Sequence, residues 1–313
     1  MDKSITSSKH AYCIIAHQDS YCLESLICLL DDEKNDIFLL IDKKADKNLT
    51  LNLRTKRGGL NIIPDEERID IRWGGLSQVK AELILFKAAV SNFHYSYIHL
   101  ISGADLPLKT QEEIHDSFEK LPGNSNVLAF SEGEHIRKNV EFKTRYYHPY
   151  LEFQRFRHDG QVAHLIQDFT AKFSRKVSVC LQKAIGYKRN WKDLELKKGS
   201  QWVSISSEFA SFLVENEKYI LKRFKGVICP DEIFLHTMLY NSKFKDTIID
   251  VSQKEIATIR KIDWERGNPY TWREKDFEEL INSDALFARK FSSKEDKEII
   301  DKIKSFLTII PNP

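Results

Sequence analysis

The feature that most constrains the fold is a regular alternation of short apolar runs with longer amphipathic stretches in the first third of the chain. The apolar runs predict strands at residues 11–16, 37–41, 69–73 and 97–102. The amphipathic stretches predict helices at 21–30 and 77–90, with Ser77 able to cap the second. Strands alternating with helices indicate an α/β fold with a mostly parallel central sheet flanked by helices.

Ligands bind such sheets beyond the carboxyl ends of the strands, which makes His17, Asp42 and Asp105 candidate site residues. Further along, Thr110 is expected to start a helix that ends before Pro122-Gly123. Residues 143–160 favour a functional loop or lid. The remaining expected elements are helices at 162–184, 208–215 and 231–239 and a strand at 202–205. Because neither a repeat nor a linker is present, we expect one domain over residues 1–313.

The charge and the cysteine content limit which binding partners and which cellular compartment we expect. The chain has 48 Lys and Arg against 46 Asp and Glu, a formal net charge of +2, so we expect no nucleic-acid partner. Its five cysteines show no zinc-like spacing and favour a reducing compartment. The first ten residues lack an apolar signal core, and no stretch approaches the roughly 20 apolar residues of a membrane span. We therefore expect a cytoplasmic protein.

Several catalytic signatures are absent from the sequence. It contains no GxxxxGK[ST] loop, no GxGxxG after a strand, no HExxH and no GxSxG. It also contains no Asp-x-Asp, the pair with which metal-dependent glycosyltransferases hold a cation on a diphosphate. The string SGADLPLKT at 102–110 stands where that pair would be expected.

A series of strings nevertheless resembles one known family. In order along the chain they are LLIDKK at 39–44, RWGGLSQVKAELILFKAA at 72–89, YIHLISGADLPLKT at 97–110, KGSQWVSIS at 198–206, PDEIFLHTML at 230–239 and FARKF at 287–291. Together they resemble the core-2/I-branching and peptide O-xylosyltransferase family over about the whole chain. The resemblance implies a GT-A-type nucleotide-diphospho-sugar transferase fold. It also implies an inverting, metal-independent transfer from a UDP-sugar to a hydroxyl, with a nucleotide-binding half at about 10–130 and an acceptor-binding and catalytic half at about 131–313.

Glu232 is the candidate catalytic base. An inverting transfer needs one carboxylate to take the proton of the acceptor hydroxyl as its oxygen attacks the anomeric carbon. By local pattern alone, Pro230-Asp231-Glu232 is also a typical helix start, with proline and acids in the first turn. The resemblance assigns the base role to Glu232, and leaves Asp231 as a capping or acceptor-contacting neighbour.

The departing diphosphate must be neutralised by side-chain cations if no metal takes part. The resemblance places Arg289 and Lys290 there, since an Arg fork grips phosphate oxygens in bidentate fashion and Lys acts as a point charge. From composition alone, we would expect both side chains of this pair to be exposed to solvent on the surface. Arg273 is a third candidate, and Arg260 replaces it if the alignment there is shifted.

The resemblance also suggests how the nucleoside is bound. Asp42 would accept a hydrogen bond from the uracil ring N–H, and His17 would contact the uridine. Without the resemblance, Asp42 reads equally well as a turn residue beside Lys43 and Lys44.

For the sugars, the resemblance assigns Ser200, Gln201 and Trp202 to the donor and acceptor pocket. The xylosyltransferase branch tends to be acidic at the position of Gln201, which argues against a xylose donor. Asp105 would orient the donor sugar or hold the adjoining loop, and Trp264 would lie on the acceptor side. The following residues form a candidate acceptor lid: Glu132, Glu134, Lys143, Arg145 and Tyr146.

The resulting expectation is a soluble microbial member of the family that uses a UDP-sugar, with GlcNAc favoured, and no metal or other cofactor. The acceptor would be a glycan or lipid-linked glycan of surface polysaccharide biosynthesis, reached by peripheral contact with the inner face of the membrane. One alternative stays open, a non-catalytic nucleotide-sugar or glycan-binding protein on the same fold. A sugar nucleotidyltransferase shares the sheet architecture, but the AHQDSYCLE segment lacks the Gly-rich, basic phosphate loop that such an enzyme uses near its amino terminus.

Overall fold

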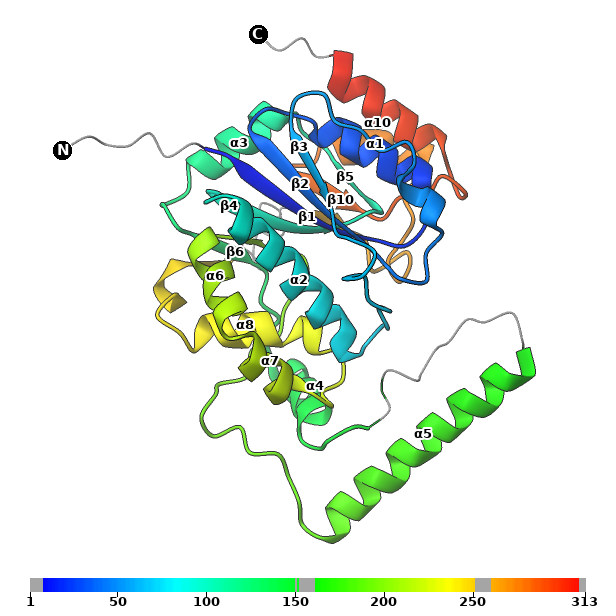
Figure 1. The fold of residues 1–313 in the computed structure, drawn as a ribbon, viewed down its shortest axis with the longest axis vertical. Coiled ribbons are helices and arrows are strands. Elements are labelled where there is room, and N and C mark those ends of the chain that lie inside the picture. The colour runs from blue at the N-terminus through cyan, green and yellow to red at the C-terminus, as the bar shows by residue number, and fades with distance from the viewer. Residues whose placement is uncertain (1–7, 150, 152–160, 251–259, 310–313) are drawn as a thin grey trace, which may run out of the picture.

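A computed structural model describes residues 8–149, 151, 161–250 and 260–309. Its central sheet has seven strands in the order β3-β2-β1-β4-β7-β6-β8. Their bounds are β1 His10–Ala16, β2 Asn35–Ile41, β3 Gly59–Ile62, β4 Tyr97–Ser102, β6 Asn126–Leu128, β7 Ser204–Ile205 and β8 Ile248–Asp250. Only the pairings made by β7 are antiparallel. The predicted α/β fold with a mostly parallel sheet is confirmed (Figure 1).

A second, three-stranded sheet has the order β5-β10-β9. Strand β10 (Phe287–Arg289) pairs antiparallel with β5 (Asp105–Pro107) and parallel with β9 (Arg260–Ile262). None of these strands was predicted, because three residues are too few to show a period. Their pairing brings the end of the chain beside the residues that follow β4.

Helices cover both faces of the central sheet and enclose two apolar cores (Figure 1). Successive side chains of β1 point to opposite faces, so Tyr12 and Ile14 join one core while Ala11 and Cys13 join the other. The first core packs under α1 (Ser20–Leu30), α3 (Gln111–Glu119), α9 (Phe277–Ile281) and α10 (Glu298–Ile309). The second packs under α2 (Leu76–Asn92), α6 (Ser207–Glu215), α7 (Glu217–Phe224) and α8 (Phe234–Tyr240).

Helix starts were predicted with mixed success. Thr110 caps α3 in a complete capping box, in which its hydroxyl accepts from the Glu113 N–H and the Glu113 carboxylate accepts from the Thr110 N–H. The prediction for Ser77 was wrong. Gly75 is the N-cap of α2, and the Ser77 hydroxyl instead accepts a hydrogen bond from the Arg72 N–H at 2.8 Å.

Three other local predictions need correction. Residues 69–73 are not a strand; the edge strand is β3, and the Lys43 N–H merely donates to the Ile69 carbonyl at 3.0 Å. The predicted helix at 231–239 is a 3-10 turn, Pro230–Glu232, followed by α8. The start of the predicted lid belongs to α4 (Glu134–Thr144), while residues 150 and 152–160 lie outside the described residues.

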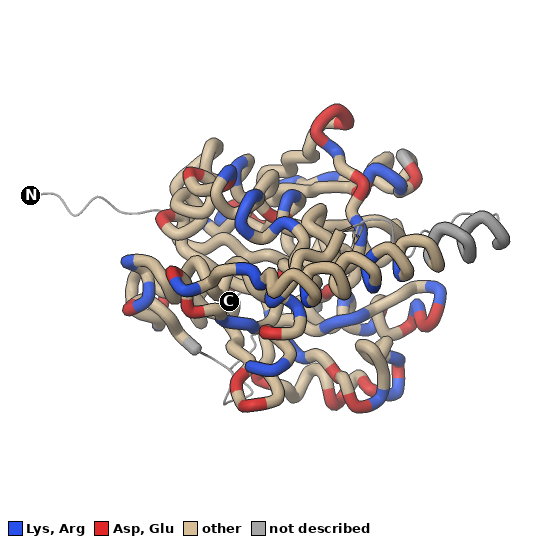
Figure 2. Tube along the Cα trace, turned by 90° about the horizontal axis from the view of Figure 1, so that it is seen from below, with Lys and Arg blue, Asp and Glu red and all other residues tan. Residues whose placement is uncertain are grey.

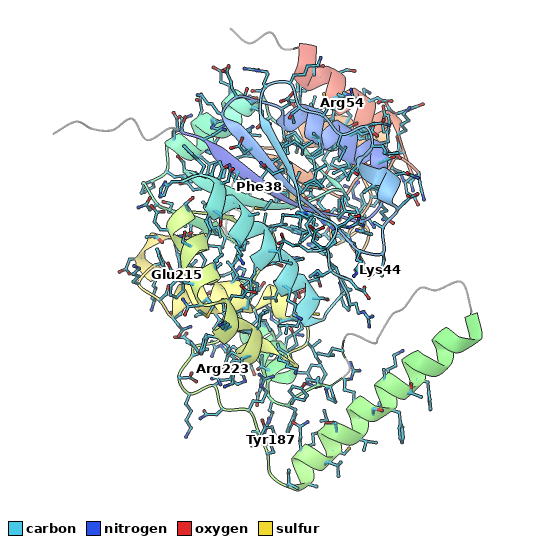
Figure 3. The ribbon with its side chains drawn as sticks, in the orientation of Figure 1. Phe38, Lys44, Arg54, Tyr187, Glu215 and Arg223 are labelled. Carbon is cyan, nitrogen blue, oxygen red and sulfur yellow. The ribbon has the colours of Figure 1, made fainter. Side chains whose placement is uncertain are left out.

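Figure 2 shows Lys and Arg interspersed with Asp and Glu along the chain. Phe38 lies within the body, between the sheet and its helices, whereas Tyr187 lies just after α5 (Gln161–Ala184), which stands away from the body (Figures 1 and 3). Within the described residues, no helix is long and apolar enough to cross a membrane. The one-domain prediction stays a prediction, although β7 and β8 bring the second half of the chain into the same sheet as β1 to β4.

Candidate active site

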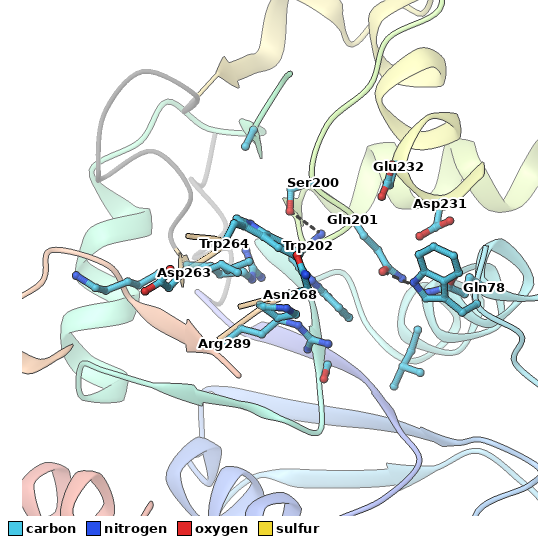
Figure 4. Close-up of a pocket in the computed structure, with 18 of the residues that line it drawn as sticks. Gln78, Ser200, Gln201, Trp202, Asp231, Glu232, Asp263, Trp264, Asn268 and Arg289 are labelled. Carbon is cyan, nitrogen blue, oxygen red and sulfur yellow. Dashed lines mark hydrogen bonds between the residues drawn. The ribbon is translucent and has the colours of Figure 1, made fainter. Parts of the chain in front are cut away.

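A cleft of about 1710 Å³ opens beyond the carboxyl ends of β1, β2 and β4 (Figure 4). This is where a parallel α/β sheet is expected to bind its ligand. Most of the residues predicted from the sequence line it: His17, Asp42, Ser200, Gln201, Trp202, Glu232, Trp264 and Arg289. Residues distant in sequence therefore converge on a single cavity.

Glu232 lies on the 3-10 turn before α8 and faces the cleft. Its Oε2 is 2.6 Å from Lys143 Nζ and 3.3 Å from Lys198 Nζ. Burial alone would raise the pKa of Glu232, but the hydrogen bonds and charges of the two lysines outweigh it and lower the pKa below its ordinary value. Glu232 is therefore an ionised carboxylate at neutral pH, the form that a general base requires.

A close approach of backbones places Lys198 beside Glu232. The Gly199 N–H donates to the Glu232 carbonyl at 2.9 Å. A Cβ on Gly199 would lie 2.0 Å from the Ala129 carbonyl oxygen and 2.2 Å from His236 Nε2, so only glycine fits there. The segment that contains Lys198 is thus held against the turn Pro230–Glu232.

Two buried acids, Asp231 and Glu82, lie close enough for the charge of one to affect the other. Asp231 lines the cleft, and burial together with the charge of Glu232 raises the pKa of Asp231 to about 7. Its Oδ1 makes no hydrogen bond within the described chain, and the turn has no side-chain cap, so the capping role expected for Asp231 is not observed. Glu82 is fully buried, and burial, with Asp231 adding to it, raises the pKa of Glu82 well above its usual range.

Gln201 joins Glu82 to the cleft. Its Nε2 donates to Glu82 Oε1 at 2.9 Å, and its Oε1 accepts from Gln78 Nε2 at 3.4 Å. Both ends of the Gln201 amide are therefore engaged, which fixes its orientation in the wall of the cleft (Figure 4). An acidic residue at this position would stand beside Glu82, which explains why a neutral amide suits this chain.

Arg289 is held between a carboxylate and an indole. Its Nη1 lies 2.7 Å from Asp105 Oδ1, and its guanidinium carbon lies 4.5 Å from the centre of the Trp202 ring. The antiparallel pairing of β5 with β10 sets Asp105 opposite Arg289. Asp105 is fully buried and does not line the cleft, and its Oδ2 accepts from the Ser102 N–H at 3.1 Å. Two roles were predicted for Asp105: to orient the donor sugar or to hold the adjoining loop. Its position fits the second role.

The other predicted cations differ in position. Arg273 does not line the cleft; its Nη2 pairs with Glu295 at 3.0 Å on the surface. Arg260 lines the cleft instead, with Nη2 donating to the Leu100 carbonyl at 3.1 Å. The position of Arg273 argues against the predicted diphosphate contact and favours Arg260. Lys290 is absent from the cleft lining but lies close enough to His17 for its charge to affect that ring.

His17 and Asp42 lie together where β1 and β2 end. Asp42 is buried, and its Oδ1 accepts from the Lys44 N–H at 3.0 Å while its Oδ2 lies 3.4 Å from Lys44 Nζ. It is thus both a turn residue and part of the cleft. Desolvation lowers the pKa of His17, and the charges of Arg289, Lys44 and Lys290 act in the same direction against the opposing charge of Asp42. The imidazole is therefore neutral at neutral pH.

Sequence reasoning missed how three side chains enter this site. Lys143 was expected in a lid without a link to Glu232, from which it is separated by 89 positions. Lys198 stands in the KGSQWVSIS string that was singled out, so that string could have indicated it. Glu82 lies within the helix predicted at 77–90, and no motif singled it out. Among the described residues, no three His, Cys, Asp or Glu side chains converge in a way that could hold a metal ion.

A family model described as Core-2/I-Branching enzyme matches residues 10–286, which include the ends of β1 and β2 and the turn that bears Glu232. The chain belongs to the core-2/I-branching enzyme family. The GT-A-type fold expected from the sequence strings goes with this membership. Arg289 and Lys290 lie just beyond the matched residues.

Curated relatives of this core-2/I-branching family chain include transferases named for two different sugars. Xylosyltransferase sqv-6 of Caenorhabditis briggsae is 27% identical over 254 residues, which cover 71% of this chain and 31% of the relative. Xylosyltransferase oxt of Drosophila melanogaster is 22% identical over 290 residues, with 86% and 30% covered. Beta-glucuronosyltransferase GlcAT14B of Arabidopsis thaliana is 24% identical over 216 residues, with 66% and 43% covered. The chain thus spans about a third of the length of the xylosyltransferases.

Proposed function

We propose that this protein is an inverting glycosyltransferase that moves a sugar from a UDP-sugar to a hydroxyl group of a glycan. The observation that carries the proposal is the position of Glu232, an ionised carboxylate that faces the same cleft as Arg289. A base and a cation are the two groups that an inverting transfer requires. Membership in a family of glycosyltransferases supports it.

In the proposed reaction, Glu232 takes the proton of the acceptor hydroxyl while that oxygen forms a bond to the anomeric carbon of the donor. The bond from the anomeric carbon to the UDP oxygen breaks, and the electron pair leaves with the diphosphate. Arg289 neutralises the developing charge, with Arg260 and Lys290 adding positive potential. Asp105 and Trp202 hold the Arg289 guanidinium, so little reorganisation is needed when the charge develops.

We further propose that no metal ion takes part, because these cations supply the charge that a metal would supply. The nucleoside would lie at the ends of β1 and β2, where Asp42 and the neutral His17 line the cleft; Asp42 would accept a hydrogen bond from uracil, and His17 would contact the uridine. GlcNAc is the donor sugar that we favour, and the neutral Gln201, with both ends of its amide engaged, argues against xylose. Trp264, with 62% of its surface exposed at the cleft, offers a plane on which an acceptor sugar can stack.

The acceptor we propose is a glycan or a lipid-linked glycan of surface polysaccharide biosynthesis. A cytoplasmic protein in peripheral contact with the inner face of the membrane would meet such an acceptor where it is assembled. The alternative of a non-catalytic nucleotide-sugar binder on the same fold predicts UDP binding without turnover. The presence of both the candidate base Glu232 and the candidate diphosphate contact Arg289 in the cleft favours catalysis over that alternative.

The test compares Glu232→Gln with the wild type. The variant keeps the shape of the side chain and removes the base, so transfer should fall by roughly 10² to 10⁴-fold. UDP binding, measured as a thermal shift in EDTA, should persist. Glu215→Gln, on the exposed end of α6, is the matched control and should retain the full rate. Full turnover in Glu232→Gln would remove Glu232 from the mechanism, and UDP binding without any turnover in the wild type would favour the binding protein.

The metal-free donor site is tested separately with UDP, UDP-GlcNAc and UDP-xylose in EDTA. We expect UDP and one UDP-sugar to stabilise the wild type, and Arg289→Met to lose most of that shift. Stabilisation that appears only after manganese is added would contradict the metal-free proposal.

A further inference from the structure

Helix α5 exposes an apolar stripe that nothing in the described structure covers. Its members follow one another at intervals of four residues: Phe169, Phe173, Val177, Leu181 and, just beyond the helix, Ile185. Their exposed fractions are 68%, 59%, 40%, 60% and 77% in that order. Side chains four apart share one face of a helix. A stripe of this size on a helix that stands away from the body is typical of a surface that is covered by something else.

Positive charge runs along one flank of this stripe. Lys172, Lys176 and Lys183 are exposed, and their spacing places all three on the same flank of the helix. Residues 169–190 contain six Lys or Arg and no Asp or Glu. Because the whole chain carries a formal net charge of only +2, this segment concentrates positive charge locally.

The end of α5 is attached to the catalytic half of the molecule. The Gln182 side chain accepts from the Tyr147 N–H at 2.8 Å and donates to the Tyr147 carbonyl at 2.7 Å. A backbone bond from the Arg189 N–H to the Arg145 carbonyl, 3.0 Å, secures the segment that follows. Tyr147 lies just after α4, the helix that bears Lys143 and through it contacts Glu232. Anything that binds α5 would therefore lie beside the cleft.

We propose that α5 docks the protein on an anionic lipid surface. The helix lies in the plane of the interface, with the Phe169–Ile185 stripe among the acyl chains and the lysine flank at the headgroups. An amphipathic helix with aromatic and aliphatic residues on one face and lysines on its polar side binds membranes in this way. The lysines reach outward past the apolar stripe, which places their charges at the level of the phosphates.

Charge distinguishes a lipid surface from a second copy of the chain. Two α5 stripes packed together would bring two lysine flanks into one contact with no acid in residues 169–190 to offset them. An anionic bilayer instead offers the opposite charge. Docking of this kind goes beyond the proposed transfer reaction and does not depend on it, although with a lipid-linked acceptor it would bring the cleft to its substrate.

The experiment measures cosedimentation of the full chain with phosphatidylcholine vesicles that contain either no phosphatidylglycerol or roughly one-third of it. We expect binding only to the anionic vesicles, weakened by added salt. The triple variant Lys172→Glu, Lys176→Glu and Lys183→Glu should lower the partition coefficient roughly tenfold or more. The triple variant Phe169→Ser, Phe173→Ser and Leu181→Ser should also lose binding, while its thermal unfolding stays close to that of the wild type because these side chains are exposed.

A matched control reverses three exposed lysines elsewhere, Lys120→Glu, Lys218→Glu and Lys222→Glu, and should bind as the wild type does. Equal loss in this control would mean that net charge and not α5 governs binding, and would overturn the proposal. Failure of the wild type to bind anionic vesicles would also overturn the proposal. So would dimerisation of the wild type that the three serine substitutions abolish, if the wild type did not bind the vesicles. Because vesicle binding is measured without nucleotide, failure of the transferase proposal leaves this result unaffected.

Discussion

At the scale of single residues, the reactivity of Glu232 depends on two ammonium groups. Lys143 Nζ and Lys198 Nζ both contact Oε2 of this carboxylate, at 2.6 and 3.3 Å. Contacts that stabilise the ionised form of Glu232 also make it a weaker base. The two lysines therefore keep the carboxylate ionised at the cost of some basicity. The approach of an acceptor sugar would have to preserve or replace them.

Substitution of Lys143 by Met should shift the pH dependence of transfer. Lys143 lowers the pKa of Glu232, so its removal raises that pKa and the acid limb of the rate profile moves to higher pH. At pH values above the new limb the carboxylate is ionised in both proteins, and the rates should converge. The measurement is a profile of kcat/KM against pH. Lys138→Met, on the exposed side of the same helix, is the control and should leave the limb in place.

Asp231 gives a prediction about stability and pH. Its pKa is raised to about 7 in the folded protein, whereas an unfolded aspartate titrates near 4. Between these values the folded state keeps a proton that the unfolded state has lost, so this carboxyl lowers stability as the pH rises through that window. Asp231→Asn should therefore be more stable than the wild type at pH 8, by on the order of 2–4 kcal/mol, and nearly equal at pH 4.

The measurement is denaturant unfolding of both proteins at several pH values. Asp116→Asn, an exposed residue of α3, controls for the loss of one carboxyl. A constant difference between Asp231→Asn and the wild type across the whole range would show that Asp231 does not retain its proton in the folded state.

At the scale of elements, close packing between segments sets the shape of one wall of the cleft. Phe130 forms an isolated bridge with Gly199, and the Ser200 N–H donates to the Ala129 carbonyl at 3.0 Å. These contacts hold residues 198–202 between the central sheet and the turn Pro230–Glu232. The segment contributes to the site because it is fixed on both sides.

Gly199→Ala should disturb that segment. The new methyl group would meet a backbone oxygen and a buried histidine, neither of which can move freely, so unfolding should become easier by about 1–3 kcal/mol. Transfer should fall with it, because Lys198 and Gln201 move. Thermal unfolding and initial rates measure the two effects. Gly123→Ala is the matched control, since nothing lies within 4 Å of its added Cβ, and it should be close to neutral.

At the scale of the whole molecule, two apolar cores share one sheet. The first half of the chain contributes β1 to β4, and the second half contributes β7 and β8 to the same sheet. Side chains from both halves also meet in the second core, as Phe86 and Phe234 do. The expected boundary between a nucleotide-binding half and an acceptor-binding half therefore does not divide the packing.

We therefore predict that the two halves unfold together. Cys13 and Cys22 are buried in the first half and Cys229 in the second, so pulsed thiol labelling across a denaturant series reports on each region. The three thiols should become reactive at the same denaturant midpoint. The exposed Cys28 and Cys180 should react in the native protein and serve as internal controls. Distinct midpoints for Cys22 and Cys229 would show two independently folding units.

Much of this molecule could be predicted from the sequence alone. Strands β1, β2 and β4 and helices α1, α2 and α3 have clear periods, because each buries one face or both faces against a core. Since parallel strands end on the same side of the sheet, the positions of His17 and Asp42 followed from those runs. The family strings placed Glu232 and the segment from Ser200 to Trp202, which the structure brings to the same cleft.

Only the tertiary structure decided the contacts between segments that are distant in sequence. The pairing of β5 with β10, the choice of Arg260 over Arg273 at the cleft, and the contact of Lys143 with Glu232 have no local signal. They depend on how loops close and on which backbones approach each other, and a period or a motif encodes neither. The same holds for α5, whose pattern predicted a helix but whose uncovered face became apparent only when the rest of the chain was packed without it.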